Sequence, residues 1–513
     1  MSNTTTADQP PPPEADAAAE TLSRRDRNVI YLLLAATFVV ILNETIMSVA
    51  LPALKADLGV DDVTVQWVAT AFMLTMAVVI PVTGILLQRV KTRPMFITAM
   101  GLFSLGTLLS ALAPGFTALL VGRIVQAVGT AVMVPLLMTT VMTLVPAAMR
   151  GRMMSNISLV IAVAPALGPT ISGLILQSLG WRGMFWVVLP IAGIMLLVGA
   201  SRIENVTETR YARIDMLSVL LSALGFGGLV YGLSQAGEGA TVDVPFMLTT
   251  TAVGVIALAA FVVRQIALQR SGSPLLDLRT FRVRAFTLSL LVVMISFGAL
   301  LGTAIILPIY MQEVLGFAPL LVGLAVLPGG LLMGLIAPVV GRIYDRRGPR
   351  VLVVPGVTLL AASLWGFTAV TSVSTPFPVL MGLHIALSLG LAMVMTPVMS
   401  TGLGAIPSHL YSHGSAIVAT LQQVAAAAGS ALFISTLAAV SAARVAAGEA
   451  PAVASAGGAQ AAFLAGAVLS SLAVLVAWFI RGSSEPAPVE PVAGSTPVES
   501  EVDGRVTAGS EQD

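Results

Sequence analysis

Two ionisable residues lie inside long apolar stretches of this sequence, where charged side chains are rare. Glu44 lies in the stretch 29–51, and Arg123 lies in the stretch 117–145. A carboxyl group in a medium of low dielectric constant can exchange protons near neutral pH. Charged groups inside a membrane usually mark the path of an ion or a substrate. We therefore predict that Glu44 is a proton-coupling site and that Arg123 is its partner.

The depth of these two residues permits them to meet. Glu44 is seven residues from the end of its stretch, and Arg123 is six residues from the start of its own. At about 1.5 Å per residue, both lie about 10 Å below the same surface. A static ion pair that joins two helices is the alternative interpretation. We also predict that a substrate cavity adjoins this pair, with Asn43 and Gln126 as candidate polar contacts. His384 is a third candidate, although a lone histidine more often only packs.

Composition places the chain in a membrane and excludes most other classes. Of the 513 residues, 57% are hydrophobic and only 10% are charged, whereas soluble proteins carry about 25% charged residues. The chain has no cysteine and three histidines, so we expect neither a metal site nor a disulfide. The formal net charge of +1 does not indicate a nucleic-acid partner. We find no catalytic cluster and no phosphate-binding glycine loop, so we predict neither an enzyme nor a cofactor.

Fourteen apolar stretches are long enough to cross a bilayer, which needs about 20 residues per helix. They are residues 29–51, 66–87, 95–113, 117–145, 155–178, 183–201, 216–235, 246–265, 286–310, 319–341, 351–371, 377–402, 415–437 and 460–480. The sequence therefore predicts an all-α integral membrane protein with 14 transmembrane helices.

Arginine and lysine are distributed unequally between the two sides of these spans. If the N-terminus is cytoplasmic, 22 of the 26 basic residues lie in cytoplasmic segments and three lie in outer loops. Cytoplasmic loops of membrane proteins carry an excess of basic residues. We therefore predict a multi-pass protein of the bacterial cytoplasmic (inner) membrane with both termini in the cytoplasm.

An internal repeat divides the chain. The segment Gly84–Arg93 resembles Gly341–Arg350, and Gly59 precedes the first segment by the same 25 residues that separate Gly316 from the second. Parallel six-helix repeats around a central site are a common design of secondary transporters. The predicted organisation is a disordered cytoplasmic tail at 1–27, a six-helix bundle at 28–203, two linker helices at 204–281, a second six-helix bundle at 282–481 and a disordered tail at 482–513.

Four motifs occur in a consistent order along the spans. They are Leu42-Asn-Glu-Thr-Ile-Met-Ser-Val-Ala-Leu-Pro52, Arg123-x-x-Gln126-Ala-x-Gly129, Ala164-x-x-x-Gly168-Pro169-x-x-Ser172-Gly173 and Gly341-x-x-x-Asp345-Arg346-x-Gly348-x-Arg350. Together they resemble the fourteen-helix drug:proton antiporters of the major facilitator superfamily. The family usually has an aspartate where this chain has Asn43 and Gln88, and these departures look like the lincomycin-resistance branch.

This resemblance implies a major facilitator fold, with two six-helix bundles and two inserted helices. It also implies proton-driven export of a small hydrophobic substrate, in some cases a cationic one, by alternating access. The proton gradient would be the energy source, and a monomer in the lipid bilayer is the expected form. Two alternatives stay open, a dedicated exporter of one endogenous metabolite and a proton-coupled importer.

The repeated basic motifs predict conformational latches. Glycine permits close approach of helices, and Asp345 can accept hydrogen bonds from arginines or cap a helix N-terminus. Simple positive-inside topology is the alternative interpretation. In the fifth span, Gly168-Pro169 removes a backbone hydrogen bond and predicts a bend. The residues assigned to these motifs are Gly84, Arg89, Arg93, Gly168, Pro169, Gly341, Asp345, Arg346, Gly348 and Arg350.

Overall fold

A computed structural model describes residues 22–60, 62–146, 149–205, 215–236, 244–270 and 274–480. The two predicted tails lie almost wholly outside these residues. In the part of the chain that the structure describes, the secondary structure is helical and no strand occurs. Thirteen of the helices are long and apolar enough to cross a membrane.

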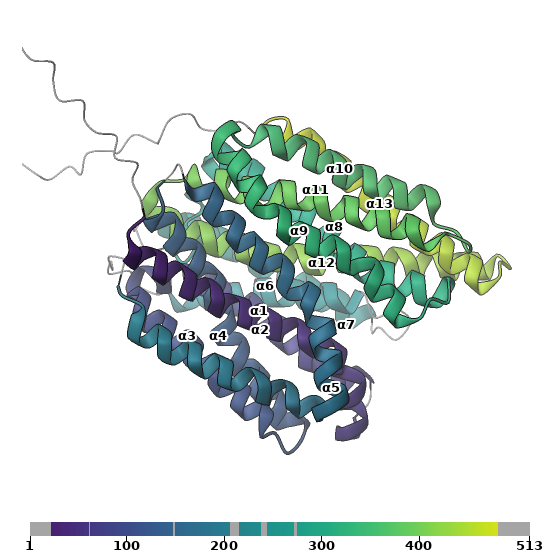
Figure 1. Ribbon diagram of the computed structural model, residues 1–513, viewed down its shortest axis with the longest axis horizontal. Helices are drawn as coiled ribbons and strands as arrows, with labels where there is room; N and C mark the ends of the chain where they lie inside the picture. The colour runs from purple at the N-terminus through teal and green to yellow at the C-terminus, as the bar shows by residue number, and fades with distance from the viewer. Residues whose placement is uncertain are drawn as a thin grey trace, which may run out of the picture.

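The first half of the molecule contains the helices α1 to α5. Their bounds are Arg24–Leu58 (α1), Asp62–Arg89 (α2), Thr92–Ala111 (α3), Phe116–Leu144 (α4) and Arg150–Arg202 (α5). The second half contains α8 to α13, with bounds Arg284–Ile309 (α8), Pro319–Arg347 (α9), Arg350–Val370 (α10), Phe377–Gly404 (α11), Tyr411–Ala446 (α12) and Pro451–Ala477 (α13). The two halves form separate groups of roughly parallel helices (Figure 1).

Helix α5 accounts for the difference between thirteen helices and fourteen predicted spans. It is 53 residues long and contains both the fifth and the sixth span. Its backbone leaves the helical conformation at Gly180, with φ 67° and ψ −176°, which glycine adopts without steric cost. The turn between the two spans therefore lies at Gly180. The bend predicted at Gly168-Pro169 is not a break in helical dihedral angles, and the side chain of Pro169 lies outside the described residues.

The repeat is visible in how the helices of each half cross. A Cβ atom added at Gly129 of α4 would lie 2.3 Å from the carbonyl oxygen of Ala99 in α3, and one at Gly390 of α11 would lie 2.7 Å from that of Gly356 in α10. Ala99 and Gly356 are separated by 257 residues, as are the repeated basic motifs. Equivalent helices therefore touch at equivalent glycines in both halves, where a side chain would hold the backbones apart.

Helices α6 (Met216–Ala236) and α7 (Val244–Gln269) form the inserted pair. The Arg264 guanidinium donates hydrogen bonds of 2.6 and 2.8 Å to the Asp215 carboxylate, and these bonds hold the pKa of that carboxyl below its usual range. Next to this ion pair, Gln265 donates to the Ser218 hydroxyl at 2.8 Å. Helix α6 also packs against α2 and α12, so the pair is attached to both halves.

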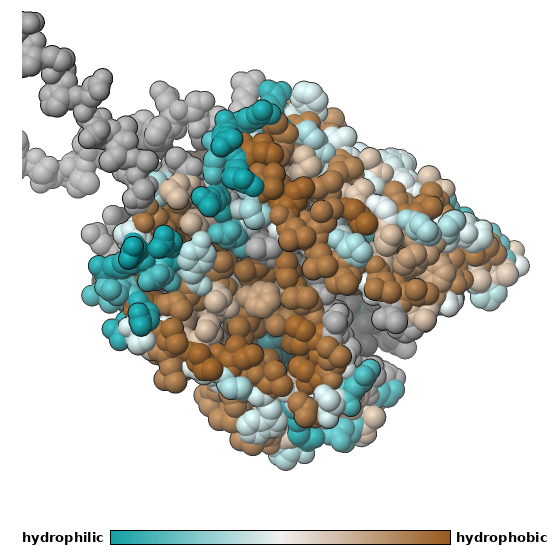
Figure 2. Space-filling view, viewed as in Figure 1, coloured by the Kyte–Doolittle hydropathy of each residue, from teal (hydrophilic) through white to brown (hydrophobic). Residues whose placement is uncertain are grey.

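We call the end of the molecule where α2 and α9 finish, at Arg89 and Arg347, the basic end. Hydrophilic residues gather at the ends of the helices, and a broad hydrophobic surface lies between them (Figure 2). Large apolar side chains are strongly exposed there, including Leu197 at 72% and Leu335 at 75%. A surface of this kind faces lipid rather than water.

Candidate functional site

Arg123 is the centre of a buried polar cluster in the first half. Only 1% of its surface is exposed. One guanidinium nitrogen donates to Gln126 Oε1 at 2.5 Å and to Asn43 Oδ1 at 3.4 Å. The guanidinium carbon also lies 4.0 Å from the centre of the Phe72 ring, a distance at which a cation is attracted to an aromatic face. The cluster therefore joins α1, α2 and α4.

The cluster continues into α3. Gln126 donates from Nε2 to the Thr107 hydroxyl at 2.7 Å, and that hydroxyl donates to the Phe103 carbonyl at 2.7 Å. Asn43, Gln126 and Thr107 are all buried. Because a buried polar group without a partner is costly, this chain of hydrogen bonds holds each side chain in one orientation. The second predicted motif thus forms a structural unit with Asn43.

Glu44 lies beside this cluster rather than in it. It is partly buried and interacts with Arg123 through its charge. Among the described residues, no hydrogen bond or ion pair joins the two side chains. Successive residues of a helix point about 100° apart, so α1 can present either Asn43 or Glu44 to α4. In this conformation it presents Asn43, and Arg123 Nε has no hydrogen-bond partner.

His384 lies in the second half, away from this cluster, at the position that corresponds to Arg123. It is 5% exposed and packs against Gly329 of α9, where an added Cβ atom would lie 2.7 Å from the imidazole Cδ2. Gly329 follows Phe72 by 257 residues, the separation of the repeated motifs. His384 follows Arg123 by 261 residues, as Gly390 follows Gly129 at the helix crossings. Each half therefore places a nitrogen-bearing side chain of its fourth helix against its second helix.

The second copy of the basic motif joins the two halves at the basic end. The backbone N–H of Arg152, in the first turn of α5, donates to the Asp345 carboxylate at 3.2 Å. Close approach makes this possible, because a Cβ atom at Gly341 would lie 2.8 Å from the Gly151 carbonyl oxygen. A carboxylate at a helix N-terminus is also favoured by the helix dipole. We call this contact the Asp345 latch.

The first copy of the motif makes the corresponding contact with α12. Gln88 donates to the Ser412 hydroxyl at 3.1 Å and shares a hydrogen bond of 2.6 Å with His413 Nε2. A Cβ atom at Gly84 would lie 3.2 Å from Ala416 Cβ. We call this contact the Gln88 latch. Ser412 and His413 were not among the predicted site residues. The repeat of the basic motif could have indicated them, because it predicts a contact in the first half equivalent to that of Asp345.

Two further contacts close the basic end and were not predicted. Thr139 of α4 and Ser415 of α12 share a hydrogen bond of 2.7 Å. Arg150 donates to the Met142 carbonyl at 3.1 Å, and its guanidinium lies 5.6 Å from the centre of the Tyr411 ring. Neither contact has a distinctive sequence motif, because hydroxyl and aromatic side chains occur throughout the spans.

The remaining residues of the two basic motifs lie at or next to the ends of helices. Helices α2 and α9 continue through most of both motifs and end at Arg89 and Arg347. Gly348 follows α9 with φ 74°, a left-handed conformation that favours glycine. Arg350 lies 5.5 Å from the Trp478 ring centre, the backbone N–H of Arg93 donates to Asn205 at 3.2 Å, and Arg346 is exposed.

The third of the four sequence motifs, at residues 164–173 of α5, packs directly on α1, next to Glu44. A Cβ atom at Gly168 would lie 2.3 Å from the Thr45 hydroxyl oxygen. Ser172 donates to the Ile46 carbonyl at 2.9 Å. Glycine at this position therefore lets α5 approach the part of α1 that carries the predicted proton site. Within the described residues, no group of three or more His, Asp or Glu side chains is arranged to hold a metal ion.

Comparison with known proteins identifies the family. The sequence profile of the Major Facilitator Superfamily matches residues 33–430. The chain belongs to the Major Facilitator Superfamily. It is therefore a multi-pass membrane protein of a superfamily of transporters, as the resemblance of its motifs predicted.

Two relatives and one solved structure describe its place in the superfamily. The chain is 42% identical to the lincomycin resistance protein LmrB of Listeria monocytogenes, over 87% of this chain and 95% of that protein. It is 30% identical to the multidrug resistance protein B homolog of Mycobacterium tuberculosis, over 76% of this chain and 72% of that protein. The human organic anion transporter MFSD10 (TETRAN) has the same fold, with a TM-score of 0.63 at 16% identity over 89% of this chain and all of that structure.

Proposed function

We propose that this superfamily member is a proton-coupled antiporter that exports hydrophobic antibiotics or drugs across the cytoplasmic membrane. Glu44 is the observation that carries the proposal. Every other Asp or Glu among the described residues lies at or near the end of a helix, whereas Glu44 lies inside the membrane-length part of α1. A carboxyl group at such a depth is costly, and groups of this kind usually mark the path of an ion or a substrate.

The surroundings of Glu44 suggest how a proton is coupled to movement. The buried positive charge of Arg123 acts on Glu44 through space, and the third sequence motif, at residues 164–173 of α5, packs on the next residue, Thr45. A shift of α1 relative to α4 would change the distance between the two charges, and with it the strength with which Glu44 holds a proton. Asn43 and Gln126 would keep Arg123 in place during this exchange.

The two latches support alternating access. The Asp345 latch and the Gln88 latch both join the halves at the basic end, where the excess of arginine indicates the cytoplasm. We infer that in this conformation the two latches close the path to the cytoplasm. Export requires these contacts to break so that the cavity can face the cytoplasm, and to form again after the substrate has been loaded.

The relatives support the class of substrate. The protein that is 42% identical over 95% of its length is named for lincomycin resistance, and the mycobacterial relative is named for multidrug resistance. A lincosamide and a lipophilic cationic dye are therefore the first compounds to test. A dedicated exporter of one endogenous metabolite would move neither.

The test is transport by inverted membrane vesicles, in which an imposed proton gradient drives exporters to accumulate their substrates. We expect the wild-type protein to accumulate the lincosamide or the dye and Glu44→Gln to lose this accumulation. Glu313→Gln is the matched control, because it removes a carboxylate from the short helix Tyr310–Val314, at the very end of the membrane-length segment that contains α8. Glu44→Asp should keep part of the activity because it keeps the ionisable group.

Two results would contradict the proposal. If Glu44→Gln keeps full gradient-driven accumulation, the proton is coupled elsewhere and Glu44 is a structural residue. If the wild-type protein accumulates neither compound although it is present in the membrane, the broad drug-exporter function is wrong and a dedicated cargo must be sought.

A further inference from the structure

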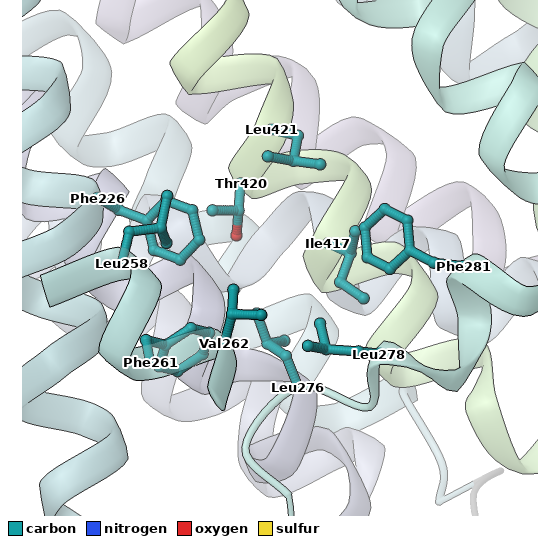
Figure 3. Close-up of a pocket in the computed structure, with 10 residues that line it drawn as sticks. All are labelled: Phe226, Leu258, Phe261, Val262, Leu276, Leu278, Phe281, Ile417, Thr420 and Leu421. Carbon is teal, nitrogen blue, oxygen red and sulfur yellow. The ribbon is translucent and has the colours of Figure 1, made fainter. Parts of the chain in front are cut away.

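A cavity of about 360 Å³ lies between the inserted pair and the second half. Phe226 of α6 and Phe261 of α7 form one wall, and Ile417 of α12 lies across from them (Figure 3). Leu276 and Phe281, from the segment that connects α7 to α8, close the cavity from the side of the basic end. This volume falls in the range of sites for small molecules, roughly 300–1,000 Å³.

The wall of this cavity is apolar. Thr420 is the polar residue among those that line it, and its hydroxyl is already engaged, because it donates to the Ala416 carbonyl at 2.7 Å. A ligand with polar groups would lose its hydrogen bonds to water and gain none in return. The occupant must therefore enter with an aliphatic or aromatic part.

The mouth of the cavity opens toward lipid. Val262 and Phe281 line the cavity and are each 37% exposed. Around this opening, α7 presents an apolar outer face, with Ile256 exposed to 69% and Val263 to 68%. An opening within such a face communicates with the hydrocarbon of the bilayer rather than with water.

Positive charge adjoins the mouth on the side of the basic end. The 3₁₀ helix Leu278–Arg282 carries Leu278 and Phe281 on the face that lines the cavity. In a 3₁₀ helix, side chains three residues apart lie above one another, so Arg279 and Arg282 share a different face, and both are exposed. Asp277 accepts hydrogen bonds from Arg279. An apolar slot beside arginines at the membrane surface matches a lipid with an acyl chain and an anionic headgroup.

We propose that this cavity binds one acyl chain of an anionic phospholipid from the leaflet at the basic end, with the phosphate near Arg282. Ile417 lies one turn of α12 beyond His413, which takes part in the Gln88 latch. Residues four apart lie on the same face of a helix, so an acyl chain in the cavity would pack on α12 one turn away from the latch. The lipid would then stabilise the conformation in which the basic end is closed.

Thermal unfolding of the full-length protein in detergent tests this proposal without any transport assay. Phosphatidylglycerol should raise the Tm by at least about 3 °C relative to phosphatidylcholine with the same acyl chains. Val262→Trp fills the mouth of the cavity and should abolish this difference, and Leu258→Trp should do the same from the neighbouring turn of α7. Val263→Trp is the matched control, since it points into lipid and should keep the difference.

Arg282→Gln separates the headgroup from the chain. This variant should lose most of the difference in Tm between phosphatidylglycerol and phosphatidylcholine. Each lipid should still raise its Tm above the value in detergent alone. The proposal is overturned if the two lipids stabilise the wild-type protein equally, or if both tryptophan variants fold and keep the full difference. It is also overturned if a lincosamide, and no lipid, gives a stabilisation that Val262→Trp removes, because the cavity would then be an entry site for substrate.

Discussion

The two halves share one arrangement of helices but carry different side chains, with different hydrogen bonding, at equivalent positions. In the first half, Arg123 lies over Phe72 and donates hydrogen bonds to the buried side chains of Asn43 and Gln126. In the second half, His384 lies against Gly329, and its Nδ1 atom has no hydrogen-bond partner. The neighbouring residue Leu387 belongs to an apolar core cluster. A repeated fold thus supplies the positions, and each half fills them differently.

At the basic end, the charged side chain of the contact belongs to the second half, whereas at the centre of the molecule it belongs to the first half. The Asp345 latch of the second half is a carboxylate at the N-terminus of α5, whereas the Gln88 latch of the first half is an amide on α12. The two latches therefore differ in kind, because the Asp345 latch depends on direct backbone contact at Gly341 and the Gln88 latch depends on two side-chain hydrogen bonds.

At the end of the molecule opposite the basic end, the two halves again differ in whether the contact involves a charged group. In the first half, Asp57 accepts hydrogen bonds of 2.9 Å from Trp181 Nε1 and from Arg182. In the second half, the Tyr310 hydroxyl donates to the Ser372 carbonyl at 2.5 Å. The first half is thus tied by a group that titrates in acid, and the second by a group that stays neutral there.

The largest expected difference between the halves is at the centre. We expect Arg123→Leu to abolish gradient-driven accumulation in inverted vesicles and to lower the Tm, because it leaves Asn43 and Gln126 buried without their partner at a cost of about 1–3 kcal/mol each. His384→Leu should leave the Tm unchanged or slightly raised, since it removes a buried nitrogen that has no partner. If His384→Leu stops accumulation as completely as Arg123→Leu, the two halves share the transport chemistry and the comparison fails.

The latches should differ by an intermediate amount. Gly341→Ala must move backbone, since its Cβ atom would lie 2.8 Å from a carbonyl oxygen, whereas the Cβ atom of Gly84→Ala meets only side chains at 3.2 Å or more. We expect Gly341→Ala to open the basic end and Gly84→Ala to change it little.

The natural sequence has no cysteine, so a pair of cysteines at Arg93 and Arg347 can carry spin labels without further substitutions. The distance between the labels should lengthen in Gly341→Ala and stay near the wild-type value in Gly84→Ala. Equal distances in both variants would show that the two latches have the same strength.

The smallest expected effect is a dependence on pH at the opposite end. Hydrogen bonds from Trp181 and Arg182 hold the pKa of the Asp57 carboxyl below its usual range. Such a group stabilises the fold at pH values above the ordinary aspartate pKa of about 3.9, and this stabilisation disappears as the pH falls through the lowered pKa.

Thermal unfolding at several pH values checks this expectation. The Tm of wild type should exceed that of Asp57→Asn at neutral pH, and the two should converge in acid. Tyr310→Phe should lower the Tm by a constant amount over the same range, because its hydroxyl does not titrate there. A difference for Asp57→Asn that does not depend on pH would mean that the carboxylate charge is unimportant.

Much of this architecture could be predicted from the sequence. The long apolar stretches required membrane-length helices, and the equal spacing of Gly59–Gly84 and Gly316–Gly341 indicated two equivalent halves. The number of helices differs only because α5 joins two spans through Gly180. These features depend on length and composition, which are local properties of the chain.

The partners of the site residues were beyond the sequence. These helices are apolar on all sides, so no amphipathic pattern indicates how each is rotated. A rotation of one residue decides whether Asn43 or Glu44 meets Arg123, and the structure presents Asn43. The same applies to His384, whose place against Gly329 depends on how α11 packs on α9.

The sequence by itself determined that the chain crosses a membrane many times, that it consists of two related halves with a basic end, and that one carboxyl group lies deep inside a span. The tertiary structure alone decided that Asp345 caps α5, that Gln88 reaches α12 and that the inserted pair encloses an apolar cavity. Hydrophobicity acts without direction and sets which segments enter the bilayer. Close contact depends on the rotation and crossing of whole helices, which are settled only when all of them pack together.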